Sequence, residues 1–133
     1  MLKIVLDTNV LVSALWSEQG NPLEILEKFF QDEFLLYYCD EIMEEYDEVL
    51  HRTKLGFSKA KVSALLEEIL VKGISSRATV SNISFIDESD RVFFDLAKEN
   101  GAFLITGNTK HYPNEPFILT PQQFLAFFLG LSS

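Results

Sequence analysis

The sequence contains a single cysteine, Cys39, and no apolar run that approaches the roughly 20 residues of a membrane-spanning helix. One cysteine excludes an internal disulfide, which fits the reducing conditions of the cytosol. The apolar residues near the N-terminus are too few for a secretory signal peptide. We therefore expect a cytoplasmic protein without a membrane partner.

Positive charge is also scarce. The chain has 11 Lys and Arg against 20 Asp and Glu, so its formal net charge of −9 opposes nonspecific attraction to nucleic acid. The charges are not evenly distributed, because acids crowd residues 18–48 and a basic stretch follows, made of His51, Arg52, Lys54, Lys59 and Lys61. This basic stretch is either a solvated loop and helix start or a track for a phosphate backbone.

Motifs of several enzyme classes are missing. There is no Gly-x-Gly-x-x-Gly or Gly-Lys-Ser/Thr loop for a nucleotide. The two histidines, His51 and His111, are far apart and Cys39 stands alone, so no zinc-type ligand spacing occurs. A haloacid-dehalogenase-like phosphatase would carry an aspartate two residues after a nucleophile at Asp7, where this chain has Asn9. The acidic pair and late lysine of response-regulator receivers are not found either.

Apolar patterning nevertheless predicts a folded chain. Hydrophobic residues make up 47% of 133 residues, without repeats or a linker, so we expect one domain over residues 1–133 with one core. Strands are expected over residues 2–6, 34–39, 78–86 (with a loop), 103–106 and 117–119, and helices lie between them. This alternation predicts an α/β fold, a three-layer α/β/α sandwich with a central parallel sheet of about five strands.

Helix ends are marked by characteristic residues. Asp40, Ser58 and Thr120 are suitable N-caps, and Pro121 suits the first position of the last helix. Asn100-Gly101 is typical of a left-handed C-cap.

Asp7 directly follows the apolar run Leu2–Leu6, which predicts a position at the carboxyl edge of the sheet, where open α/β folds place ligands. Thr8 and Asn9 can cap a helix that starts near Val10. Asp7 is therefore either a site carboxylate or only part of a helix cap.

Two helical acids border buried faces. Glu45 follows the apolar Ile42 by three residues, and Asp90 precedes Phe93 by three, which places each at the edge of an apolar stripe. The same helical spacing predicts that Asp95 points away from the core. Either bordering acid alone could be a surface residue, but together with Asp7 they predict a carboxylate cluster.

Carboxylates that converge repel one another unless a cation neutralises them. Mg²⁺ and Mn²⁺ take oxygen ligands and keep several waters, which suits a sparse acidic cluster. Two such ions would activate water and stabilise both oxygens of a phosphodiester hydrolysis.

Four segments in order, residues 7–13, 44–50, 87–93 and 104–108, resemble the motifs of PIN (PilT N-terminus-like) domains, in particular the nucleases that act as toxins in bacterial toxin–antitoxin pairs. The resemblance covers essentially the whole chain. It implies that Asp7, Glu45 and Asp90 are catalytic and bind the metal, with Asn108 and Asp87 as further candidate ligands. It also implies substrate-side or supporting roles for Thr8, Asn9, Ser13 and Thr106. Ser13 could instead simply pack, and Thr106 could satisfy local backbone groups.

The resemblance implies a metal-dependent ribonuclease that cuts single-stranded RNA, often as a homodimer with a cognate antitoxin protein. Relatives commonly carry an aspartate at or shortly after the position of Asn108, but here Asn108 and His111 occupy these places. Two hypotheses follow from this departure. The chain is an Mg²⁺- or Mn²⁺-dependent endoribonuclease, or it is a catalytically silent PIN-like module that binds RNA or a protein.

Overall fold

The sheet is entirely parallel, in the order β3-β2-β1-β4-β5, in a computed structural model that describes residues 1–131. Its strands are β1 (Lys3–Leu6), β2 (Leu35–Tyr38), β3 (Ile74–Ser75), β4 (Phe103–Ile105) and β5 (Ile118–Leu119). The α/β class and the five-stranded parallel sheet expected from the sequence are confirmed.

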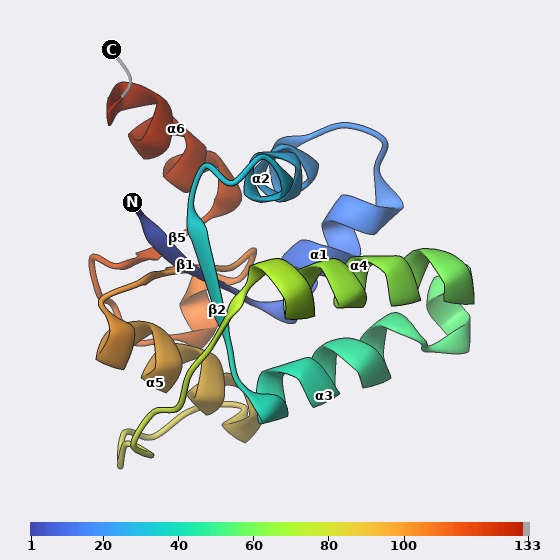
Figure 1. The fold of residues 1–133 in the computed structure, drawn as a ribbon. Helices are drawn as coiled ribbons and strands as arrows, with labels where there is room; N and C mark the ends of the chain where they lie inside the picture. The colour runs from blue at the N-terminus through green and yellow to red at the C-terminus, as the bar shows by residue number, and fades with distance from the viewer. Residues whose placement is uncertain (132–133) are drawn as a thin grey trace.

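Helices cover both faces of this sheet. They are α1 (Thr8–Trp16), α2 (Asn21–Phe30), α3 (Asp40–Leu50), α4 (Lys59–Lys72), α5 (Arg91–Asn100) and α6 (Pro121–Leu131), with short 3₁₀ turns η1 (Thr53–Leu55), η2 (Glu88–Asp90) and η3 (Thr109–His111). α2 and α6 pack together on one side, and α5 lies against β1, β2 and β4 on the other (Figure 1). α3 and α4 form a helical hairpin, and α3 also contacts α1.

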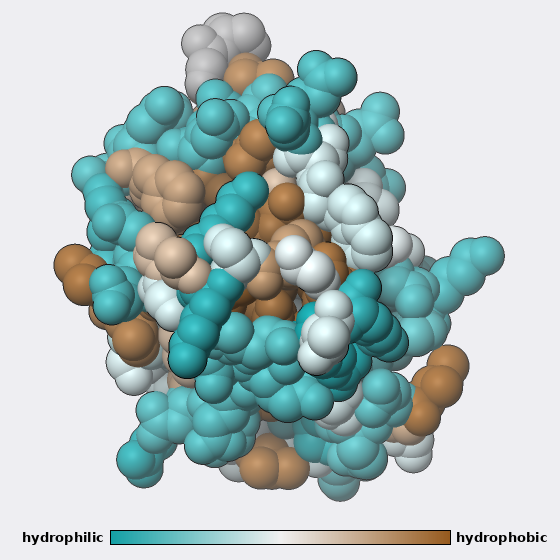
Figure 2. All heavy atoms as spheres, turned by 90° about the vertical axis from the view of Figure 1, so that its right-hand side faces the viewer, coloured by the Kyte–Doolittle hydropathy of each residue, from teal (hydrophilic) through white to brown (hydrophobic). Residues whose placement is uncertain are grey.

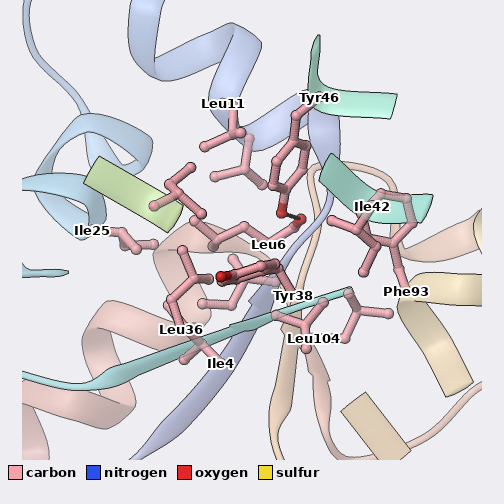
Figure 3. Packing of buried hydrophobic residues seen from close by; sticks show 14 of the residues in the cluster. Ile4, Leu6, Leu11, Ile25, Leu36, Tyr38, Ile42, Tyr46, Phe93 and Leu104 are labelled. Atoms are coloured by element: carbon pink, nitrogen blue, oxygen red, sulfur yellow. Dashed lines mark hydrogen bonds between the residues drawn. The ribbon is translucent and has the colours of Figure 1, made fainter. Parts of the chain in front are cut away.

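β1 occupies the centre of the sheet, which explains its composition. Ile4, Val5 and Leu6 have no exposed surface, because helices cover a central parallel strand on both faces. Figure 3 shows Leu6 beside Tyr46 of α3, whose hydroxyl donates to the carbonyl oxygen of Leu6 at 2.5 Å. This bond ties α3 to the end of β1, next to Asp7.

Most expected helix ends are confirmed. The Ser58 hydroxyl accepts from the backbone N–H of Lys61, and the Thr120 hydroxyl accepts from that of Gln123. Gly101 ends α5 in the left-handed conformation, with φ 63°. Asp40 was wrongly expected as an N-cap, because α3 begins at Asp40 and Cys39 takes the cap position.

The segment after β3 differs from the expectation. Residues 78–86 contain no strand, and the third strand is the two-residue β3 just before them. Instead, the segment lies along α5, where the carboxylate of Asp95 accepts from the backbone N–H of Ser81 at 3.0 Å. Asp95 is therefore buried rather than solvent-facing, because a loop that periodicity cannot place covers its side of the helix.

The face at the right of Figure 1 is mostly hydrophilic, with apolar atoms gathered near its middle (Figure 2). Within residues 1–131, no helix combines the length and apolarity needed to cross a membrane.

Candidate active site

Asp7 lies at the carboxyl end of β1 and is only 7% exposed. It occupies the N-cap position of α1, yet its side chain makes no capping hydrogen bond. Its Oδ2 instead accepts from the hydroxyls of Thr106 at 2.9 Å and Tyr112 at 2.8 Å. No hydrogen bond from the described residues reaches Oδ1. The interpretation of Asp7 as only a helix cap is therefore wrong.

Thr106, fully buried at the end of β4, organises the neighbouring turn. While donating to Asp7, its Oγ1 accepts from the backbone N–H of Asn108 at 3.0 Å and from Nδ2 of Asn9 at 3.3 Å. The Asn9 side chain also accepts from the backbone N–H of Gly107 at 2.9 Å. Both interpretations of Thr106 hold, because it satisfies local backbone groups and also orients the Asp7 carboxylate.

Glu45 is half-buried on α3, as its place beside the apolar stripe predicts, whereas its helix neighbours Glu44 and Glu48 are exposed. The hydroxyl of the buried Thr8 donates to Glu45 Oε2 and so links the start of α1 to the middle of α3. Burial raises the pKa of Glu45, the Thr8 hydrogen bond opposes this, and the negative charge of Asp7 raises the pKa further. The two carboxylates are therefore electrostatically coupled.

Asp90 ends η2 immediately before α5 and is 9% exposed. Burial, followed by repulsion from Asp7 and Asp87, raises its pKa to about 6. Its Oδ2 is buried and has no hydrogen-bond partner. Within the part of the chain that the structure describes, it is the one buried side-chain oxygen or nitrogen in this condition. A buried carboxylate oxygen without a donor is costly unless a cation satisfies it.

Asp87, the further candidate ligand, caps η2. Its Oδ1 accepts from the backbone N–H and the hydroxyl of Ser89 at 3.0 and 2.9 Å. These bonds lower the pKa of Asp87, and the nearby His111 lowers it slightly more.

Asn108 and His111 lie together after β4. The Asn108 amide nitrogen lies 2.9 Å from Nε2 of His111, while Nδ1 of the same ring lies 3.6 Å from Oδ2 of Asp90. This turn therefore faces the unpartnered oxygen of Asp90.

Tyr112 is the functional residue that the sequence analysis missed. It is 7% exposed, and burial together with the charge of Asp7 raises the pKa of its phenol well above the usual value, so it remains a hydrogen-bond donor. The sequence feature that could have pointed to Tyr112 is an aromatic residue with a polar hydroxyl within the polar segment that follows the fourth motif.

The structure thus brings the three acids near one another, because the negative charge of Asp7 raises the pKa of both Glu45 and Asp90, and the charge of Glu45 also raises the pKa of Asp90. Among residues 1–131, however, no three or more His, Cys, Asp and Glu side chains already converge closely enough to hold a metal. Carboxylates without a cation between them repel, which favours such an open arrangement. The carboxylate oxygens of this site that accept no hydrogen bond from the described residues are suitable ligands for a hard divalent cation.

Two hollows border this edge of the sheet. Ser13 is exposed and lines a hollow of about 350 Å³ with Asn9, Gly107 and Asn108. Another, of about 630 Å³, lies between the start of α3, residues 75–80 and α5. Neither hollow is lined by Asp7, Glu45 or Asp90.

The basic stretch is partly neutralised. His51 pairs with Asp47 at 3.1 Å and Arg52 with Glu48 at 2.8 Å, as on a solvated helix end. The exposed Lys54, Lys59 and Lys61 form no ion pair with any residue that the structure describes.

Comparison with known proteins identifies the family of this chain. A family model described as the PIN domain matches residues 3–110. An uncharacterized protein of Methanocaldococcus jannaschii is 30% identical over 110 residues, a stretch that covers 80% of this chain and 71% of that protein.

Proposed function

The chain belongs to the PIN domain family, and we propose that it is an Mg²⁺- or Mn²⁺-dependent endoribonuclease that hydrolyses phosphodiester bonds in single-stranded RNA. PIN domains are generally nucleases that use a divalent metal. The observation that carries the proposal is the buried carboxylate of Asp90, whose Oδ2 has no hydrogen-bond partner among the described residues and which lies close enough to Asp7 to be affected by its charge.

Each acid has a defined part in this proposal. Asp7 is held by Thr106 and Tyr112 so that its second oxygen is available to a cation, and Glu45 is oriented by Thr8. Asp7, Glu45 and Asp90 would hold a divalent ion, which would supply a water of lowered pKa and positive charge to offset the charge that develops on the phosphate. Hydrolysis would add a water oxygen to phosphorus, break one P–O ester bond and leave a proton on the departing oxygen.

The surroundings offer contacts for the substrate. Ser13, Asn9 and Asn108 line one hollow beside the acids and supply hydroxyl and amide groups for sugar or phosphate oxygens. The exposed Lys54, Lys59 and Lys61 follow α3 in the chain and pair with no acid among the described residues, so they could supply positive charge for a phosphate backbone although the net charge is −9.

Asp90→Asn tests the proposal directly, because it removes charge with little change in volume. We expect loss of Mn²⁺ binding in calorimetry and loss of Mn²⁺-dependent cleavage of a labelled single-stranded RNA, while the circular dichroism spectrum is retained. Glu45→Gln should also lose cleavage, whereas Glu44→Gln, on the exposed face of the same helix, should match the parent.

The rival function is a silent module that binds RNA or a protein without cutting it, which the neutral Asn108 favours. Parent protein that folds but neither binds Mn²⁺ nor cuts RNA would establish the rival. Equal cleavage by the parent and Asp90→Asn would place any activity outside this site.

We further propose that the nuclease is the toxin of a toxin–antitoxin pair, bound by a cognate antitoxin protein and acting as a homodimer. The similarity of the four motifs to those of toxin nucleases supports this. Induced expression in a bacterial host should arrest growth, and Asp90→Asn should not. Co-expression with the product of the neighbouring reading frame should relieve the arrest, and light scattering should give twice the chain mass.

A further inference from the structure

His111 lies within the candidate site, between Asn108 and Asp90. It ends η3, its side chain is 44% exposed, and its two ring nitrogens face different neighbours. Nε2 lies 2.9 Å from the side-chain amide of Asn108, and Nδ1 lies 3.6 Å from Oδ2 of Asp90. The ring therefore stands between an amide and a buried carboxylate oxygen.

The 3.6 Å separation is informative. It is longer than the roughly 2.7–3.2 Å of a nitrogen–oxygen hydrogen bond, and Asp90 Oδ2 indeed has no hydrogen-bond partner. Two ligands that each lie about 2.1 Å from one ion can be at most about 4.2 Å apart. The two atoms are thus too far apart to satisfy each other and close enough to share a cation.

On the basis of the proposed metal-dependent function, we propose that His111 Nδ1 and Asp90 Oδ2 form a mixed nitrogen–oxygen ligand pair, and that this pair selects Mn²⁺ over Mg²⁺. A neutral imidazole in place of a carboxylate removes one negative charge and adds a nitrogen donor. Mg²⁺ prefers oxygen ligands, whereas imidazole is a ligand for transition metals.

Asn108 is a positioning residue in this proposal rather than a ligand. A ligating Nδ1 requires the ring proton on Nε2. The structure places the Asn108 amide nitrogen 2.9 Å from Nε2, so the proposal requires the amide to turn over and present its oxygen as the acceptor; the two ends of an amide have nearly the same shape. Histidine ligands commonly donate their second N–H to such a partner, which sets the tautomer and the ring orientation. Asn108 is in turn anchored by its backbone N–H to Thr106.

The test measures the affinities of Mn²⁺ and Mg²⁺ by calorimetry for the parent, His111→Ala and His111→Asp. We expect the parent to bind Mn²⁺ more tightly than Mg²⁺. His111→Ala should weaken Mn²⁺ binding by about 10-fold or more and Mg²⁺ binding by less, which lowers the preference. His111→Asp should restore or raise Mg²⁺ affinity and also lower the preference. His51→Ala, the only other histidine, should leave both affinities unchanged.

Nuclear magnetic resonance of the unmutated protein gives an independent readout. Substoichiometric Mn²⁺, which is paramagnetic, should broaden the imidazole signals of His111 before those of His51. This measurement requires no variant and so remains decisive if a substitution unfolds the chain.

The inference is overturned if His111→Ala leaves the Mn²⁺ to Mg²⁺ preference unchanged, or if it tightens Mn²⁺ binding, as expected of a histidinium that only pairs with Asp90. Simultaneous broadening of both histidines would also overturn it. In each case, loss of Mn²⁺ binding in Asp90→Asn would leave the proposed function standing. Unchanged Mn²⁺ binding in Asp90→Asn would reject both.

Discussion

The two ends of the candidate site are built differently. At the β1–β4 edge, the Asp7 carboxylate accepts from Thr106 and Tyr112, and Thr106 is itself bonded to Asn9 and Asn108. At the η2 turn, Asp90 is equally buried but its Oδ2 accepts nothing. The first region is completed by protein hydroxyls, whereas the second keeps an oxygen that the proposed cation would satisfy. The comparison suggests that the hydrogen bonds around Asp7 preorganise the site, whereas the unsatisfied oxygen of Asp90 would favour ligand binding.

Thr106→Val should have the largest effect on the completed region. It keeps the side-chain volume but leaves Asp7, Asn9 and Asn108 each without one partner. We expect a loss of roughly 2–4 kcal/mol in the free energy of unfolding, measured with urea in the presence of a chelator. Thr53→Val, at an exposed hydroxyl without a hydrogen bond to any described residue, is the matched control. A loss no greater than in the control would mean that the network does not hold Asp7.

The incomplete region should respond to pH. Because the pKa of Asp90 is raised from 3.8 to about 6, the folded state favours its protonated form. Its contribution to stability is therefore full below about pH 4 and is lost as the pH rises through about 6. Relative to Asp90→Asn, the metal-free parent should lose up to about 3 kcal/mol across this window.

Urea denaturation from pH 4 to pH 7.5 in chelator measures that difference, and saturating Mn²⁺ should remove it in the parent by stabilising the ionised carboxylate. Parallel pH curves for the parent and Asp90→Asn would contradict the assignment of Asp90 as the unsatisfied acid.

Tyr112→Phe should act on the completed region less strongly than Thr106→Val, because it removes one hydrogen bond and no backbone anchor. We expect a loss of about 1.5 kcal/mol in the free energy of unfolding and slower RNA cleavage at saturating Mn²⁺. Tyr37→Phe, whose hydroxyl bonds to no described residue, should change neither quantity. Cleavage at the parental rate would show that Thr106 alone orients Asp7.

Asn108→Asp should change stability least. The added carboxylate increases repulsion in the metal-free site, so the free energy of unfolding in chelator should fall by less than about 1 kcal/mol. The melting temperature in chelator should therefore be slightly lower. It should also strengthen Mn²⁺ binding and accelerate cleavage, either as a direct ligand or by accepting more strongly from His111. Unchanged Mn²⁺ affinity would identify Asn108 as a structural amide.

Much of this architecture could be predicted because it depends on local patterns. The spacing of Glu45 from Ile42 predicted an acid at the edge of a buried stripe, and Glu45 is half-buried. The predicted exposure of Asp95 was wrong, because the prediction assumed that solvent covers the outer side of α5. The third strand was misplaced because a two-residue strand such as β3 carries no detectable alternation.

The sequence by itself determined the order of strands and helices, the parallel sheet and the place of Asp7 at its carboxyl edge, since these follow from apolar periodicity and from the end of a buried strand. Only the tertiary structure decided which groups meet Asp7 and Asp90. Thr106 and Tyr112 lie 99 and 105 residues from Asp7 along the chain. His111 reaches Asp90 only because β4 pairs with β1 and α5 packs across both. Hydrogen bonds and charges act over a few ångströms of space, so their partners are set by packing and not by separation in sequence.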